Sequence, residues 1–127
     1  MKKLLTLSLL LLMSSLAYGQ IFLRAKGLAL GKKDIYTQEV VWPSEFETVN
    51  VLIEVEENKV TIHSQLLQVY RKVNMVIKTE NLAVWYCLDS RGEGCNFKVI
   101  TLPDFPGTIF IAVEYNDYTW IYATTRE

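Results

Sequence analysis

The chain has 127 residues, which is the size of one ordinary domain with a single hydrophobic core. Its 13 basic and 14 acidic side chains give a formal net charge of −1, which argues against nucleic acid or an anionic membrane surface as the natural partner. Two cysteines and one histidine are too few, and too far apart in sequence, for a typical zinc site.

Residues 1–19 have the pattern of a secretory signal peptide. A Met-Lys-Lys start precedes an apolar run from Leu4 to Met13, and the small residues Ala17 and Gly19 come before a predicted cleavage after Gly19. The apolar run is too short to span a bilayer, which needs about 20 residues, so no stable membrane anchor is expected. Cleavage removes two of the 13 basic side chains. We therefore expect a secreted or periplasmic domain over residues 20–127.

The first part of this domain is expected to contain two strands. Residues 20–30 have a mixed strand pattern, with residues 31–34 as the exit turn. Residues 35–42 are rich in strand-forming residues and are stopped by Pro43. Residues 44–47 are predicted to be a loop or a single helical turn, the one place where the sequence admits helix.

Residues 49–56 alternate apolar and polar side chains, which is typical of a half-buried strand. A two-residue turn at Glu57-Asn58 pairs this strand with residues 59–63. The resulting register places His63, the single histidine, beside Leu52 on the more polar face. Since neighbours in a strand point to opposite faces, His63 and Ser64 do not form a nucleophile and base pair, and no catalytic residue is predicted.

Residues 66–79 are expected to form one bent strand or two short strands, followed by a hairpin over residues 82–102 that contains both cysteines. A three-residue loop at residues 90–92, with Gly92 in the left-handed conformation, sets Cys87 opposite Cys95.

The competing two-residue turn at Gly92-Glu93 would pair Cys87 with Lys98 and separate the thiols. In an exported protein the first register accounts for both cysteines, so a disulfide between Cys87 and Cys95 is expected. Closing a loop of this length stabilises a fold by roughly 2–3 kcal/mol. No further cysteine or nearby histidine favours a metal or redox role for the pair.

The chain ends in a second clear hairpin. Two prolines within residues 103–107 break the preceding strand. Residues 108–115 and 118–125 then pair around Asn116-Asp117, which predicts an aromatic ladder across the two strands.

Eight to ten short strands in one domain indicate an all-β fold. We predict a small antiparallel β-barrel, because the strands follow one another through tight turns, with a two-layer β-sandwich as the alternative. A cysteine hairpin on a small exported barrel resembles, in layout, the periplasmic lysozyme inhibitors and the lipocalin-like carriers. No motif residue carries a site across from either family.

The aromatic side chains are the best functional lead. Tyr70, which shares a strand face with Gln68 and Lys72, and Tyr86, which lies away from the cysteines, are the candidate partner-binding residues. They favour a non-catalytic module that binds a protein or carbohydrate, without a cofactor.

A carrier of a small apolar ligand and a structural subunit of a surface or viral assembly are the alternatives. Large inward residues such as Trp85, Phe97 and Trp120 would fill a small barrel and so argue against the carrier.

Overall fold

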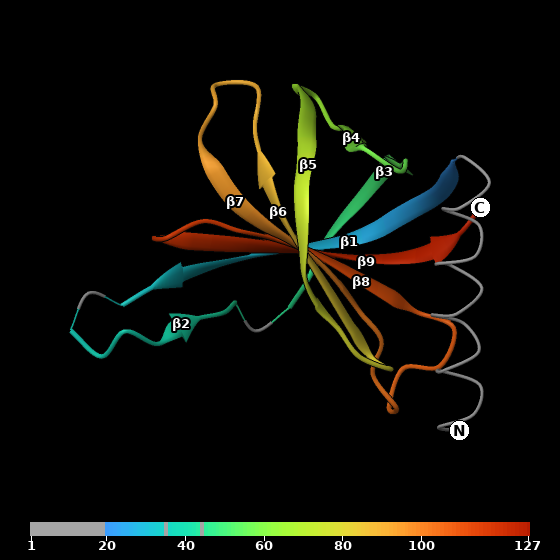
Figure 1. Ribbon diagram of the computed structural model, residues 1–127. Coiled ribbons are helices and arrows are strands. Elements are labelled where there is room, and N and C mark those ends of the chain that lie inside the picture. The colour runs from blue at the N-terminus through green and yellow to red at the C-terminus, as the bar shows by residue number, and fades with distance from the viewer. Residues whose placement is uncertain (1–19, 35, 44) are drawn as a thin grey trace.

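Nine antiparallel strands form the part of the chain that the computed structural model describes, residues 20–34, 36–43 and 45–127 (Figure 1). The signal peptide predicted for residues 1–19 lies outside these described residues. The strands are β1 Ile21–Lys33, β2 Val40–Val41, β3 Glu47–Val55, β4 Lys59–His63, β5 Leu67–Lys78, β6 Leu82–Leu88, β7 Gly94–Ile100, β8 Ile109–Glu114 and β9 Tyr118–Arg126.

Eight of these strands close into a barrel. Each strand from β3 to β8 pairs with the next along the chain, and β1 pairs with both β3 and β9. The short β2 adds to the side of β1 and is not part of the closed ring. The predicted all-β barrel is therefore confirmed, and the alternative of a two-layer sandwich is wrong.

The barrel interior is filled by side chains from every second position of the strands. Leu23, Ile53, Phe97 and Ile111, from four different strands, are each 0% exposed. Burial of one such side chain stabilises the fold by about 1.5–3 kcal/mol. The alternation of buried and exposed residues along β1, β3 and β7 is what the period of a strand requires when one face lines a core.

The three predicted hairpin registers are all present. Ile53 pairs with Ile62 between β3 and β4, Cys87 pairs with Cys95 between β6 and β7, and Val113 pairs with Trp120 between β8 and β9. Gly92 has a φ of 81°, as the three-residue loop requires. Turn chemistry predicted two of these registers, and turn chemistry together with the pairing of the two cysteines predicted the third.

The predictions for the first two strands were partly wrong. β1 continues to Lys33, since it pairs with β9 as far as Lys32. Gly31 serves close packing and not a turn: a Cβ there would lie 2.8 Å from the Trp42 ring. The second strand is only Val40–Val41, which pairs with the last two residues of β1.

No helical turn is present at residues 45–47, because Glu47 already begins β3. Residue 44, the first of that predicted turn, lies outside the described residues.

β5 is a single bent strand, as one of the two expectations had it. Its pairing with β6 shifts register between Lys72 and Asn74 and again between Met75 and Ile77. Such shifts mark β-bulges, which bend a strand and increase its local twist. Its partner on the other side, β4, pairs only with residues 67–71.

Candidate functional site at the barrel mouth

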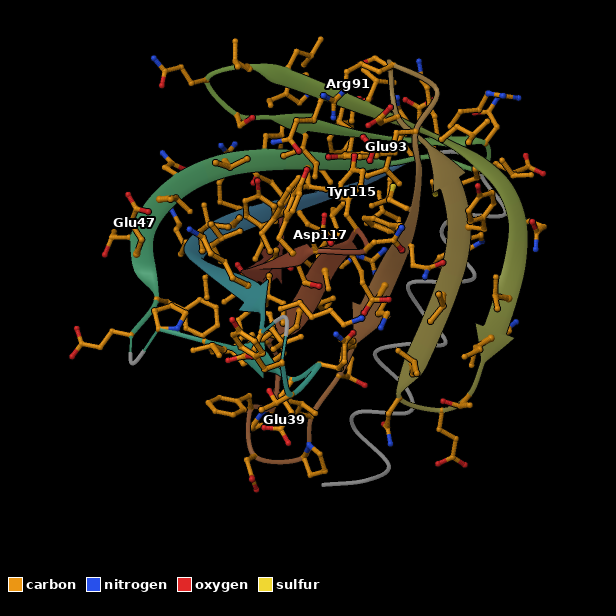
Figure 2. All side chains as sticks on the ribbon, turned by 90° about the vertical axis from the view of Figure 1, so that its left-hand side faces the viewer. Glu39, Glu47, Arg91, Glu93, Tyr115 and Asp117 are labelled. Atoms are coloured by element: carbon orange, nitrogen blue, oxygen red, sulfur yellow. The ribbon has the colours of Figure 1, made fainter. Side chains whose placement is uncertain are left out.

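Four connections lie at the same end of the barrel, because successive strands run up and down. They are residues 34–46, 64–66, 89–93 and 115–117, and this end is called the mouth here. Figure 2 faces the mouth, with Tyr115 near its centre and Arg91, Glu93, Glu47 and Glu39 around it.

Three aromatic rings of the β8–β9 hairpin pack on one another at the mouth. The ring centroids of Tyr115 and Tyr118 are 5.1 Å apart, and those of Tyr118 and Trp120 are 5.4 Å apart. The tight turn produces this arrangement, because the Tyr115 amide donates to the Tyr118 carbonyl and so places the two rings side by side. We call Tyr115, Tyr118 and Trp120 the aromatic stack.

Asp89 fixes the turn of the cysteine hairpin and ties it to the aromatic stack. Its Oδ1 accepts hydrogen bonds of 2.9 Å from the amides of both Arg91 and Glu93, and its Oδ2 accepts one of 2.8 Å from the Tyr115 hydroxyl. Burial by itself would raise the pKa of Asp89, but these hydrogen bonds hold the pKa below its usual value. Burial, followed by the bond to Asp89, raises the pKa of Tyr115. The carboxylate is therefore charged and the phenol neutral at physiological pH.

A cavity of about 260 Å³ opens beside the aromatic stack. Two leucines of the β4–β5 connection form its outer rim, with Leu66 81% and Leu67 61% exposed. We call this cavity the mouth groove. Its lining includes Leu66, Leu67, Gln68, Tyr70, Asp89, Arg91, Tyr115, Tyr118 and Trp120.

The indole nitrogen of Trp120 is buried next to this groove and has no hydrogen-bond partner among the described residues. An unpaired buried donor destabilises a fold by about 1–3 kcal/mol. A group that is kept in spite of such a penalty is a frequent sign of a functional constraint.

The rim of the mouth is acidic. Figure 2 shows carboxylates of Glu39, Glu47, Glu93 and Asp117 around the opening. Besides Asp89, which is hydrogen-bonded within its own turn, the exposed or partly exposed carboxylates of the mouth in the described residues are Asp34, Glu39, Glu45, Glu47, Glu93 and Asp117. The cations of the same region are Lys32, Lys33 and Arg91. Carboxylates thus outnumber cations by two to one.

The structure separates the two tyrosines predicted to bind a partner. Tyr70 faces the barrel interior and is only 3% exposed, and its hydroxyl donates a 2.6 Å hydrogen bond to Gln68. The partly polar face that Tyr70 shares with Gln68 and Lys72 points into the barrel, with the two polar side chains toward its ends. Tyr70 forms part of the mouth groove.

Tyr86 lies on the outer face, as predicted, and is 38% exposed. Its ring covers Gly94 and borders a second cavity of about 350 Å³. Whether Tyr70 or Tyr86 contacts a partner stays a prediction.

Lys72 is a residue that sequence reasoning missed. Its ammonium donates to the Glu56 carbonyl at 2.8 Å and lies 4.3 Å from the centre of the Trp85 ring. Burial lowers the pKa of Lys72 to about 8. It borders a cavity of about 640 Å³ away from the mouth. The only feature of the sequence that could have indicated this buried lysine was its place on the same strand face as Tyr70.

The two cysteines lie directly opposite each other but are not bonded in the structure. The Asp89 amide donates to the Glu93 carbonyl, so this pair and the Cys87–Cys95 pair two residues away are of the hydrogen-bonded kind. Cα atoms of such pairs are about 5.5 Å apart, which is within the range that a disulfide bridges. Burial raises the pKa of Cys87 to about 11 and that of Cys95 to about 12. The disulfide stays a prediction.

His63 lies on the outer face, where its Nε2 is 2.7 Å from Glu54. The hydroxyl of Ser64 donates to the Leu66 carbonyl and not to the imidazole. Within the described residues, no three His, Cys, Asp or Glu side chains lie close enough to hold a metal ion.

No known protein family, curated protein or solved structure matches this chain. In the described part of the chain no helix is long and apolar enough to cross a membrane.

Proposed function

We propose that this chain is an exported, non-catalytic binding module that holds a basic protein surface at the barrel mouth. The observation that carries the proposal is the aromatic stack beside the mouth groove, with Leu66 and Leu67 exposed on its rim.

The apolar contribution to binding would come from the rim. Large exposed side chains at the mouth include Leu30, Tyr36, Leu66 and Leu67. Exposed apolar side chains gathered at one end of a small domain are typical of an interaction site. The rings of the aromatic stack give the adjoining groove a rigid wall, because each is held by its neighbours. A rigid wall lowers the ordering entropy that a partner must overcome on binding.

The charge of the rim favours a basic partner. Carboxylates of Glu39, Glu47, Glu93 and Asp117 surround the opening in Figure 2. Like charges on a partner would be repelled, while lysine and arginine side chains would be attracted, which raises the association rate more than the final affinity.

A protein fits this surface better than a carbohydrate or a small apolar ligand. Sugar rings need an open aromatic face, whereas the rings of the aromatic stack pack against one another. An apolar ligand would need an interior cavity, whereas Phe97, Leu23 and Ile111 fill the centre of the barrel.

Export and the disulfide belong to the same proposal. Removal of residues 1–19 would release the domain into an oxidising compartment, and Cys87 and Cys95 would then bridge the hairpin that carries Asp89. The register of the two cysteines supports this part of the proposal.

The test is site-specific photo-crosslinking in the native compartment. A benzophenone amino acid at Leu67 should capture a protein with a basic surface, while the same probe at Leu102, which is 40% exposed at the opposite end, should not. A Glu47→Lys change should reduce capture, and Glu80→Lys, its matched control away from the mouth, should not. Equal capture from both probe positions would contradict the proposal.

A further inference from the structure

The second half of β5 has one edge without a partner strand. On one side, β6 pairs with β5 as far as Lys78. On the other side, β4 pairs only as far as Arg71, and the Lys72 amide donates to the Asn58 carbonyl. Beyond that point no strand among the described residues pairs with this edge. We call residues 73–78 the β5 overhang.

The β5 overhang is only partly protected as a free edge. Its apolar side chains Val73, Met75, Val76 and Ile77 are between 42% and 54% exposed. Natural edge strands are normally blunted by proline, by charged side chains or by β-bulges, and of these residues 73–77 have only the bulges. Unpaired backbone groups flanked by exposed apolar side chains are the features that β-strand addition uses.

Space for an added strand lies beside this edge. The cavity of about 640 Å³ has Val73, Asn74 and Met75 of the overhang on one wall. The opposite wall is formed by Gln20 and by the β3–β4 turn, residues 56–58. Lys72 and Trp85 complete its lining. A strand added to this edge would lie about 4.8 Å from β5.

The charged side chains of the β3–β4 turn determine which end of an added strand should be basic. Glu56 and Glu57 line the cavity next to Val73, and neither carboxylate forms an ion pair within the described residues. Glu56 Oε1 accepts a hydrogen bond from the Gln20 amide, and Lys72 is bonded to the Glu56 carbonyl. The Lys72 ammonium interacts electrostatically with Glu57, so two carboxylates and one ammonium leave the cavity lining with a net charge of −1, which favours a cationic group.

The direction of the added strand follows from β4. β4 runs antiparallel to β5, and a strand that continues this side of the sheet in the same direction would have its carboxyl end next to Val73 and Glu57. We propose that the β5 overhang is a strand-addition site for an extended apolar peptide segment with a lysine or arginine at its carboxyl end. This site is separate from the mouth and does not depend on the function proposed there.

The experiment uses a fluorescent probe peptide, acetyl-Thr-Val-Thr-Val-Thr-Lys-amide, titrated into the exported protein and followed by anisotropy. The wild type should bind it, and binding should weaken about tenfold or more with Glu57→Lys and with Val76→Lys. Glu80→Lys and Leu102→Lys, at exposed positions outside the cavity, should bind as the wild type does. Near-UV circular dichroism establishes that each variant is folded.

Backbone hydrogen exchange provides a second readout. Saturating peptide should slow exchange at those amides of residues 73–78 whose N–H groups point to the free edge. A peptide with its lysine at the amino end should bind more weakly.

Three outcomes would overturn the proposal. They are no binding at 1 mM peptide, protection confined to residues outside the overhang, and a wild-type dimer in sedimentation that Val76→Lys converts to a monomer. The last result would assign the edge to a second copy of the chain.

Discussion

The Tyr115 hydroxyl donates a 2.8 Å hydrogen bond to the Asp89 carboxylate, and this contact joins the turns of the β6–β7 and β8–β9 hairpins. The two residues are 26 positions apart in sequence. Asp89 also accepts hydrogen bonds from two amides of its own turn. One carboxylate therefore fixes the position of the loop that carries Arg91 and of the aromatic stack. The shape of the mouth groove depends on this pair.

Removal of the Tyr115 hydroxyl should destabilise the domain. Tyr115→Phe keeps the ring and loses a partly buried hydrogen bond to a charged group, which contributes about 1.5–3 kcal/mol to the free energy of unfolding. Urea denaturation of the variant measures the loss. Tyr118→Phe, in the same aromatic stack, is the control. A change below about 0.5 kcal/mol in Tyr115→Phe would mean that the bond is not important for stability.

The exported protein should contain no free thiol. Cys87 and Cys95 are directly opposite each other in the register of β6 and β7, at a separation that a disulfide can bridge. Thiol titration in denaturant without a reducing agent measures this directly. Two reactive thiols per chain in material purified from an oxidising compartment would refute the disulfide.

The reduced protein should lose stability at alkaline pH. The folded state raises the pKa of Cys87 from 9.0 to about 11 and that of Cys95 to about 12. A group whose folded pKa is raised stabilises the fold fully below its unfolded pKa, and this contribution is lost as the pH rises above it. The free energy of unfolding of the reduced protein should therefore fall between about pH 9 and 11.

The oxidised protein is the control for this pH dependence, because it has no thiol to ionise. The stability difference between the two forms should widen from pH 8 to pH 10.5. A constant difference would show that the thiols are not buried as described.

The parts of the fold that the sequence predicted are those set by local chemistry. The Gly92 loop and the tight turns at Glu57-Asn58 and Asn116-Asp117 determine which residues face each other. Once three hairpins are in register, closure into a barrel needs only that β1 reach β9.

The parts of the fold that the sequence did not predict depend on contacts between residues that are distant in sequence. Gly31 looked like a turn residue, but its place in β1 is required by Trp42 packing over it. The polar neighbours of Tyr70 suggested a contact surface, whereas they lie at the ends of an inward-facing row where water is within reach. The mouth itself could not be predicted, because the contact of Tyr115 with Asp89 follows from the pairing of β7 with β8, which joins the two hairpins.

Tyr86 and Gly94 should show coupled effects on stability. A Cβ at Gly94 would contact the Tyr86 hydroxyl and lie 2.9 Å from the ring carbon that bears it. Gly94→Ala should therefore destabilise the domain by about 1–3 kcal/mol through overpacking. In the double variant with Tyr86→Ala the added methyl group should be tolerated. Strictly additive losses in thermal or urea unfolding would show that the two residues do not interact.

The central claim, that the mouth binds a basic protein, is tested most directly by the affinity of the crosslinked partner for two leucine variants. Calorimetry with the purified partner should give a Kd for Leu67→Ala about tenfold or more above that of the wild type, as truncation of an interface anchor does. Leu102→Ala, which removes an exposed leucine at the opposite end, should bind like the wild type. Equal affinities of Leu67→Ala and the wild type, or a loss in Leu102→Ala alone, would contradict the assignment of the mouth as the binding site.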